Sequence, residues 1–315
     1  MNDKPVELIH QPVMLERVRE LLGPALSRPQ ATYLDCTLGL GGHAAALLED
    51  HPGLRVIGID RDRAALELAA ARLGTGEFRN TTYDHLDEVL ESAGITHVDG
   101  ILMDLGLSSL QIDDPGRGFS YLADGPLDMR MSRDEPLTAA DLLGEVSAPT
   151  LAKMLRSLGG EVNAARIAQA IKAAGPVATT GELVSVIDGA VPPHLRGNGH
   201  GAKRTFQALR IQLNRELLLL EQALPKALSA LVPGGRLVVL AFHSGEDRLV
   251  KAAFAKAASD RAPAGLPQVP PELEATHELL TRGAEKAGAK EIKANPRAAS
   301  VRLRAIQRRA VGKVA

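Results

Sequence analysis

The sequence has little cysteine, few aromatic residues and no long hydrophobic run. Cys36 is the single cysteine among 315 residues, so an intramolecular disulfide and a zinc site built on several thiolates are both excluded. A lone thiol fits a reducing compartment, and we expect the protein to be cytoplasmic. No stretch approaches the roughly 20 apolar residues that a membrane span requires, and residues 1–10 lack the apolar core of a secretory signal. We therefore expect no membrane partner.

An excess of charge of one sign is also missing. Lys and Arg number 37 against 38 Asp and Glu, giving a net charge of −1. This balance does not by itself indicate a nucleic-acid partner, so the distribution of charge along the chain matters more. Hydrophobic residues make up 45% of the chain, which suffices for one large domain, one domain with an insertion or two smaller domains. No metal-ligand spacing is visible in the sequence.

A glycine-rich turn at residues 31–43 has the form of a strand, a tight loop and the start of a helix. A second apolar strand ends in Asp60, and the separation between Gly39 and Asp60 fits one βαβ unit. Gly39 and Gly41 can take backbone angles that other residues disfavour, so the chain can pass close to a ligand. Asp60 can accept hydrogen bonds from a ribose diol, which indicates a nucleotide-type binding site.

The identity of the nucleotide stays open at this point, because Gly39, Gly41 and Ala44 also satisfy the dinucleotide pattern of nicotinamide-dependent oxidoreductases. Asp35 precedes the glycines at a position where S-adenosylmethionine enzymes commonly keep an acid. His43 follows the glycines at the N-terminus of a helix, where an anion such as a ligand carboxylate is favoured. These two residues favour S-adenosylmethionine.

Three carboxylates are expected at one edge of the predicted sheet. The strand at residues 98–104 ends in Asp104, just as two earlier strands end in Asp35 and Asp60. Ligands of open α/β sheets bind at the carboxyl ends of the strands, so we expect the three acids to converge there. Tyr83 is expected to close a third strand at residues 78–83, either as a stacking surface for adenine or as an ordinary half-buried aromatic residue.

The stretch from 105 to 131 shows no sustained periodicity and is predicted to be an ordered active-site loop, since apolar residues anchor it. Polar candidates on this loop are Ser108, Ser109, Gln111, Arg117, Asp128 and Arg130. Short helices are expected over 138–191, as an insertion before the fifth strand. A long helical pattern over 204–231 is predicted to kink or break at Pro225.

The C-terminal part combines a candidate site residue with a basic tail. His243 lies at the expected active edge, and Ser244 with Asp247 fits a helix capping box. Residues 291–315 hold seven Lys or Arg against one acid, for a net charge of +6. Within them, residues 300–306 alternate as an edge strand would, so the charge suggests a phosphate-facing surface or protection of a sheet edge.

Several motifs together resemble the MraW (RsmH) family of bacterial methyltransferases, which act on cytosine N4 in small-subunit (16S) ribosomal RNA. They are residues 35–43 (Asp-Cys-Thr-Leu-Gly-Leu-Gly-Gly-His), 104–109 (Asp-Leu-Gly-Leu-Ser-Ser), 117–120 (Arg-Gly-Phe-Ser), 125–131 (Gly-Pro-Leu-Asp-Met-Arg-Met), 204–211 (Arg-Thr-Phe-Gln-Ala-Leu-Arg-Ile) and 295–298 (Asn-Pro-Arg-Ala). The resemblance covers nearly the whole chain. The chain departs from it at Tyr83, Leu110 and Gly245, where the family usually has Phe, Pro and Leu.

The resemblance implies an α/β fold, with a Rossmann-like class I methyltransferase sheet and an inserted helical domain. Residues 1–112 and 204–315 would form the S-adenosylmethionine-dependent domain, and 113–203 the active-site loop and the helical insertion that recognises substrate. The cofactor contacts that it implies fall on Gly41, Gly42, His43, Asp60, Tyr83, Asp104 and Gln111. The implied partner is 16S ribosomal RNA within the small ribosomal subunit, with the protein as a monomer or a homodimer.

The catalytic hypothesis centres on Asp104. An acceptor aimed at the N–H bonds of the cytosine amine would direct the nitrogen lone pair at the methyl group. Ser108 or Ser109 would hold the base and the proton that is lost after methyl transfer. The candidate substrate contacts are Phe119, Asp128, Arg130, Arg204 and His243. A nicotinamide-dependent oxidoreductase and a non-catalytic ribosome-assembly factor with a vestigial pocket remain the alternatives.

Overall fold

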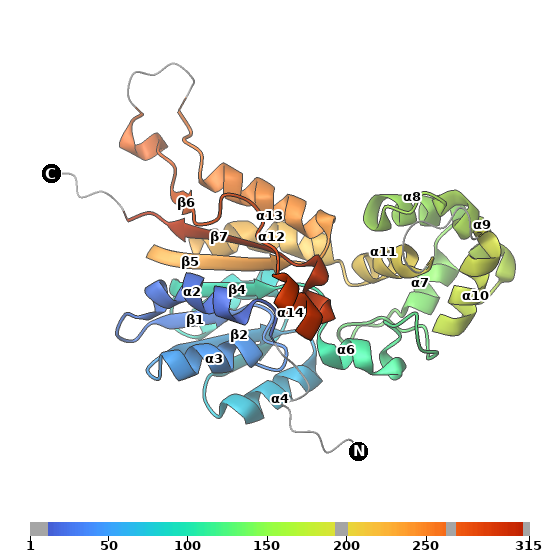
Figure 1. Ribbon diagram of the computed structural model, residues 1–315, viewed down its shortest axis with the longest axis horizontal. Helices are drawn as coiled ribbons and strands as arrows, with labels where there is room; N and C mark the ends of the chain where they lie inside the picture. The colour runs from blue at the N-terminus through green and yellow to red at the C-terminus, as the bar shows by residue number, and fades with distance from the viewer. Residues whose placement is uncertain (1–11, 193–200, 263–268, 311–315) are drawn as a thin grey trace. The chain divides into compact units, whose positions relative to one another are not determined.

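The computed structural model describes residues 12–192, 201–262 and 269–310, and it separates into two compact units (Figure 1). The first unit comprises Met1–Gly106 and Leu217–Ala315, and the second comprises Leu107–Glu216. Each unit buries its own hydrophobic clusters. The second unit is therefore an insertion between two halves of the first.

The first unit is built on a seven-stranded sheet in the order β3-β2-β1-β4-β5-β7-β6. The strands are β1 (Thr32–Asp35), β2 (Arg55–Asp60), β3 (Glu77–Asn80), β4 (Val98–Asp104), β5 (Leu231–Ala241), β6 (His277–Leu279) and β7 (Arg302–Arg308). Strands β1 to β5 pair in parallel, whereas β7 is antiparallel to both β5 and β6. The predicted α/β fold with a Rossmann-like sheet and a helical insertion is confirmed.

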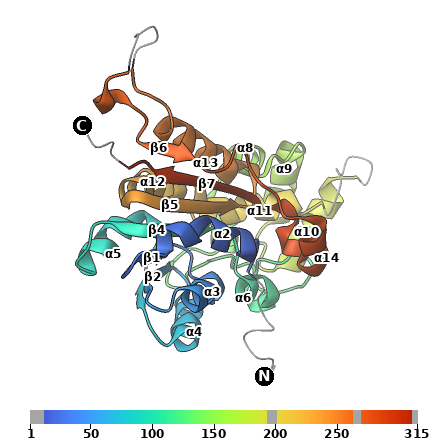
Figure 2. The same cartoon turned by 60° about the vertical axis from the view of Figure 1, so that its left-hand side comes forward.

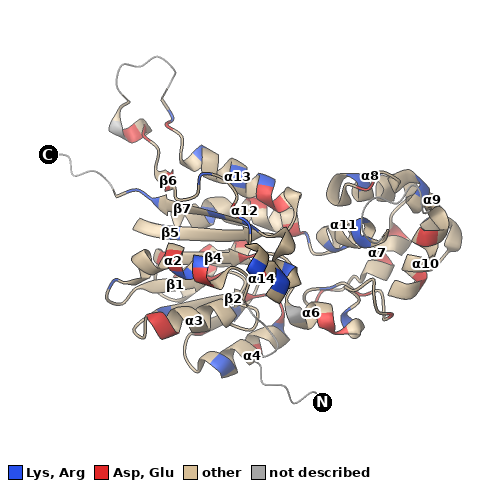
Figure 3. Cartoon of the chain, in the orientation of Figure 1, with Lys and Arg blue, Asp and Glu red and all other residues tan. Residues whose placement is uncertain are grey.

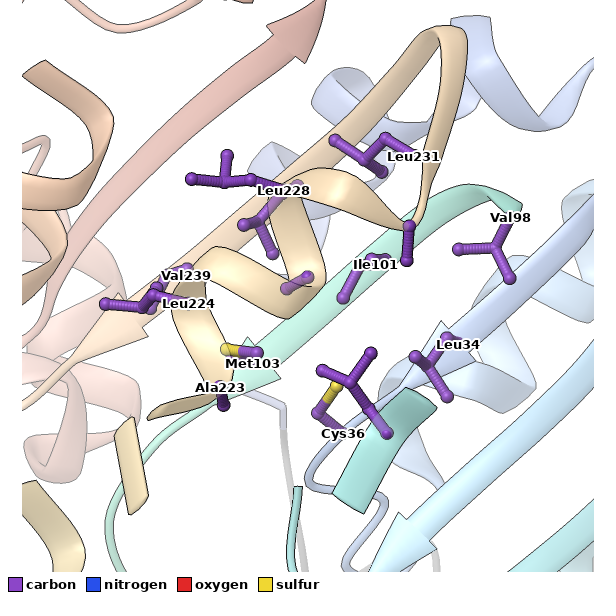
Figure 4. Close-up of a cluster of buried hydrophobic side chains, with 14 of the residues drawn as sticks. Leu34, Cys36, Val98, Ile101, Met103, Ala223, Leu224, Leu228, Leu231 and Val239 are labelled. Atoms are coloured by element: carbon purple, nitrogen blue, oxygen red, sulfur yellow. The ribbon is translucent and has the colours of Figure 1, made fainter. Parts of the chain in front are cut away.

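Helices cover both faces of this sheet (Figures 1 and 2). The helices and short 3-10 turns of this unit are α2 (Leu15–Leu26), α3 (Gly42–Asp50), α4 (Arg63–Leu73), η1 (Tyr83–His85), α5 (Leu86–Ser92), α12 (Glu216–Ser229), α13 (Ser244–Ala257), η4 (Pro271–Leu273), α14 (Ala289–Ala294) and η5 (Pro296–Ser300). One cluster of buried side chains joins α2, α3 and α4 to the sheet, and another joins α5, α12 and α13 to it. Figure 4 shows Leu224 and Leu228 of α12 over Ile101 and Met103 of β4.

The second unit is helical. It contains α6 (Ser109–Asp113), η2 (Pro115–Arg117), α7 (Ala139–Glu145), α8 (Ala148–Gly159), α9 (Ala164–Ala174), α10 (Thr180–Ala190) and α11 (Lys203–Leu213). Thr138 and Thr179 each begin a helix through a capping box, which satisfies N–H groups that the helix itself cannot. An added Cβ at Gly159 would lie 2.3 Å from the carbonyl oxygen of Arg204, so this glycine allows α8 and α11 to pack closely.

Several predicted boundaries were wrong. Tyr83 does not close the third strand, because β3 ends at Asn80 and Tyr83 begins the 3-10 turn η1. Helix α12 continues through Pro225, since the burial of its apolar face against the sheet outweighs the lost backbone hydrogen bond. The break comes instead at 214–215, where Arg215 has a φ of +54°.

The C-terminal strand is not an edge strand as predicted. Strand β7 lies between β5 and β6, and β6 was not anticipated because its three residues are too short for a periodic pattern. The alternation over 300–306 arises because Leu303 and Ala305 are buried against the α2 face of an internal strand. No helix in the described part of the chain is long and apolar enough to cross a lipid bilayer.

Candidate active site

The carboxylates Asp35, Asp60 and Asp104 end three neighbouring parallel strands, as predicted. Asp35 is only 2% exposed and accepts hydrogen bonds from the Tyr33 hydroxyl (2.8 Å) and the Thr37 N–H (3.1 Å). Burial raises the pKa of Asp35 to about 6, although these hydrogen bonds oppose the shift. Its carboxyl group therefore holds the start of the glycine-rich turn through Thr37. These contacts do not favour the expectation that Asp35 faces a ligand.

Asp60 shapes the glycine-rich turn from the neighbouring strand. Its Oδ2 accepts from the Gly39 N–H (2.7 Å) and its Oδ1 from the Asp62 N–H (2.8 Å). Burial raises the pKa of Asp60 to about 6, against the effect of these two N–H groups. Because each carboxylate oxygen has two lone pairs, Asp60 can still accept hydrogen bonds from a diol.

The turn itself requires glycine at two positions. Gly39 and Gly41 have φ values of +52° and +70°, in the left-handed region that side chains disfavour. Gly41 is the N-cap of α3 and gives this helix no side-chain cap. The first N–H groups of α3, beginning at Gly42, thus lie at a helix N-terminus that is suited to an anionic group.

His43, in the first turn of α3, meets Asp104 at the end of β4. Its Nε2 lies 3.0 Å from the carbonyl oxygen of Val13, which can only accept, so Nε2 carries the hydrogen. Its Nδ1 lies 3.6 Å from Asp104 Oδ2. Nδ1 therefore faces a carboxylate oxygen of Asp104.

Asp104 has one oxygen without a protein partner. Its Oδ1 is buried and has no hydrogen-bond partner among the described residues. Burial raises the pKa of Asp104 to about 8, and the nearby carboxyl groups of Asp35 and Glu246 add to the shift. The backbone N–H of Asp104 donates to the Thr37 hydroxyl (2.7 Å), a contact that the sequence did not reveal. An orphaned buried acceptor at this edge is suited to a polar ligand.

Two further candidate residues of this unit, Tyr83 and His243, make packing and helix-capping contacts. Tyr83 is half-buried and packs against the cluster beneath α5 and α12. His243 is 8% exposed and caps α13, where its Nδ1 accepts from the N–H groups of Gly245 (3.2 Å) and Glu246 (3.4 Å). His243 with Glu246 forms the capping box, so the predicted box of Ser244 and Asp247 was wrong by one residue.

In the second unit, the candidates on the 105–131 loop are held by short-range contacts. Ser108 caps α6, with its Oγ accepting from the Gln111 N–H (3.3 Å), while Gln111 Oε1 accepts from the Ser108 N–H (3.1 Å). Ser109 is the first residue of α6. This capping box was not predicted, although Ser and Gln three residues apart are its signature.

The loop also contains a closed ion pair. Arg130 donates through Nε and Nη2 to Asp128 at 2.8 Å each, and through Nη1 to two loop carbonyls. Burial alone would raise the pKa of Asp128, but Arg130 outweighs it and lowers that pKa. Phe119 is 7% exposed and lies in the helical core, so core packing is favoured over stacking on a base.

Helix α11 carries two arginines with different surroundings. Arg204 is partly exposed, whereas Arg210 makes a bidentate ion pair with Glu216, at 2.8 and 2.9 Å. Asn214, which sequence reasoning missed, is 1% exposed and joins the end of α11 to the loop. It accepts from the Met131 N–H (2.8 Å) and donates to the Met129 carbonyl (2.9 Å). Only its place before a helix break could have signalled this role.

The chain is similar to known proteins over nearly its whole length. Residues 7–309 match the MraW methylase family. A protein named ribosomal RNA small subunit methyltransferase H from Beutenbergia cavernae is 51% identical over 314 residues, covering 97% of this chain and 94% of its own. The protein of that name from Saccharopolyspora erythraea is 52% identical over 307 residues, covering 95% of this chain and 93% of its own.

Proposed function

Because this chain belongs to the MraW methylase family, we propose that it transfers a methyl group from S-adenosylmethionine to N4 of a cytidine in small-subunit (16S) ribosomal RNA. The names of its relatives support ribosomal RNA as the substrate. The observation that carries the proposal is the buried, partnerless Oδ1 of Asp104 at the edge where three strands end in carboxylates.

The residues of the first unit fit S-adenosylmethionine. Asp60 offers acceptor lone pairs for a ribose diol, and the N-terminus of α3 at Gly41, Gly42 and His43 suits a carboxylate. Tyr83 would lie against the adenine, and Gln111 would add a contact from α6. Once bound, S-adenosylmethionine supplies an electrophilic methyl group.

Asp104 would act on the cytosine amine. The lone pair of this nitrogen is delocalised into the ring, so an acceptor on its N–H bonds is needed to direct the lone pair outward. Asp104 Oδ1 is free to accept such a hydrogen bond. A carboxylate with a pKa of about 8 is also a stronger base than an ordinary aspartate, so it can take the proton that the nitrogen loses after methylation.

His43 would act as a positioning residue for that proton. Since the Val13 carbonyl fixes the hydrogen of the imidazole on Nε2, the lone pair on Nδ1 faces Asp104. This nitrogen can share the proton that Asp104 receives. Ser108 or Ser109 would hold the base.

Residues 113–203, which make up most of the second unit, are proposed to recognise the RNA, as the family resemblance implies. Arg204 would contact a phosphate, whereas Asp128 and Arg130 would order the loop that meets the nucleotide. Phe119 and His243 would contribute through packing and capping. We further propose that the protein acts in the cytoplasm on the assembled small subunit.

The test is methyl transfer from labelled S-adenosylmethionine to undermethylated small ribosomal subunits, with naked ribosomal RNA and DNA in parallel. Nucleoside analysis should place the label in N4-methylcytidine. Binding of S-adenosylmethionine without methyl transfer to any RNA would contradict the assignment of RNA as the substrate. Binding of a nicotinamide dinucleotide in place of S-adenosylmethionine would favour the oxidoreductase.

A further inference from the structure

A basic segment, residues 282–297, precedes β7 in the first unit. It carries five cationic side chains against two acids: Arg282, Lys286, Lys290, Lys293 and Arg297, with Glu285 and Glu291. All five cationic residues are exposed. Lys290 and Lys293 are three residues apart on α14 and therefore share a face of that helix. Figure 3 shows this concentration of positive charge on α14.

Both acids of the basic segment are engaged with α2 or the residue that precedes it. Glu285 accepts from Arg17 Nε (2.7 Å) and Nη2 (2.9 Å), and Glu291 Oε1 accepts from the Met14 N–H (2.6 Å). No ion pair joins Lys290 or Lys293 to any residue in the described ranges. The segment thus presents Lys290 and Lys293 to solvent, while its two acids attach it to α2 and the residue before it.

Two of the three arginines of β7 behave differently. Arg304 forms an ion pair with Asp247 at 2.7 Å, and Arg308 donates to the carbonyls of Ser229 and Leu231. Their charge is used within the unit. The lysines of α14, in contrast, are exposed and make no ion pair within the described ranges.

The basic segment lies at the carboxyl edge of the sheet. Arg302 at the start of β7 pairs with Ala241 at the end of β5, and Leu240 pairs with Asp104. Helix α14 and η5 directly precede β7 in the chain, so they lie beside this edge. The contact from Glu291 to Met14 stands next to the contact from Val13 to His43, which ties the segment to the proposed catalytic edge.

We propose that the basic segment binds the phosphate backbone of the RNA substrate beside the target nucleotide. The inference rests on the proposed function and assigns an RNA contact to the methyltransferase unit itself, in addition to the helical insertion. Lysines that project unpaired from a fastened helix are suited to phosphates as point charges. An RNA backbone is the binding partner that matches such exposed positive charges next to a nucleotide-modifying site.

The experiment compares two double variants with the same change in charge. Lys290→Gln with Lys293→Gln removes both cations from α14, and Lys251→Gln with Lys256→Gln removes two exposed lysines from α13 as the matched control. Glutamine preserves helix propensity. Affinity for undermethylated small subunits is measured across a range of salt concentrations, together with wild-type methyl transfer and S-adenosylmethionine affinity.

The α14 variant should bind subunits roughly tenfold more weakly near physiological salt, and its salt slope should fall by about 2 relative to wild type. Affinity for S-adenosylmethionine should not change, and the α13 control should retain wild-type binding. Equal affinities and equal salt slopes for the two variants would overturn the inference. Methylation by the wild-type protein in the same experiment would leave the proposed function standing. A wild-type protein that neither bound nor methylated subunits would overturn both.

Discussion

Among single residues, Asp104 differs from Asp35 and Asp60 in what its oxygens contact. Both oxygens of the other two carboxylates accept hydrogen bonds from the protein, whereas Oδ1 of Asp104 has no partner among the described residues. The free acceptor therefore distinguishes Asp104 within the trio. Leaving a buried carboxylate partly unsatisfied destabilises the folded state, and binding of a donor relieves that cost.

The first prediction concerns stability. The folded-state pKa of Asp104, about 8, lies above the ordinary value, so this carboxyl group destabilises the folded state once it ionises in the unfolded chain. The destabilisation is absent at low pH and grows as pH rises toward 8. Asp104→Asn should therefore raise the melting temperature, and by more at pH 8.5 than at pH 5. Thermal unfolding at the two pH values checks this. Glu91→Gln, which removes an exposed carboxylate from α5, is the control and should give no such gain.

The second prediction concerns the pH dependence of activity. If the carboxylate form of Asp104 is required, kcat/KM for S-adenosylmethionine should rise with pH and level off above about pH 8. His43→Gln should move the midpoint of this profile, because Nδ1 faces Asp104 at 3.6 Å. A steady-state profile from pH 6 to 9 gives both results. A profile that is flat, or unmoved in the variant, would contradict the coupling.

Among the elements, the sequence predicted the parallel strands well and the connections less well. Strands β1, β2 and β4 are apolar runs that end in Asp, a local signal that survives without tertiary context. Pro225 was misread because its local preference is overridden by burial of α12, and β6 is too short to show a period. The contact between His43 and Val13 joins residues that are 30 apart in the sequence, so no local pattern could predict it.

The third prediction concerns the turn before α3. Gly41→Ala places a side chain at a φ of +70° and a Cβ 3.3 Å from Leu73, at a cost of about 1 to 3 kcal/mol. S-adenosylmethionine affinity should fall with stability, because the turn and the start of α3 would shift together. Calorimetric titration and thermal unfolding measure the two effects. Gly53→Ala meets no atom within 4 Å and should change neither.

At the scale of the whole molecule, the chain has separate cores in its two units. Phe206 lies in the helical core, 4% exposed and edge-on to Tyr121 at a centroid distance of 5.8 Å. Phe254 lies in the core beneath α12 and α13 and is 2% exposed. The sequence indicated an insertion from the change of pattern after residue 104, but not that α11 belongs to the helical core. Its packing on α8 depends on Gly159 and is a tertiary feature.

The fourth prediction follows from these separate cores. Phe206→Ala should destabilise the helical unit by about 3 to 5 kcal/mol, so amide hydrogen exchange should accelerate in α8, α9 and α10 while β1, β2 and β4 stay protected. Affinity for S-adenosylmethionine should persist. Phe254→Ala should give the opposite pattern. Acceleration throughout the chain in both variants would mean that the two units unfold as one.

The most direct test of the account is the rate of a single turnover by Asp104→Asn, at saturating S-adenosylmethionine, on undermethylated small subunits. Loss of the carboxylate base should slow formation of N4-methylcytidine by about 10² to 10⁴, while the variant still binds the RNA and remains folded. A rate near that of the wild type would contradict the role of Asp104 as the base that takes the proton from the amine.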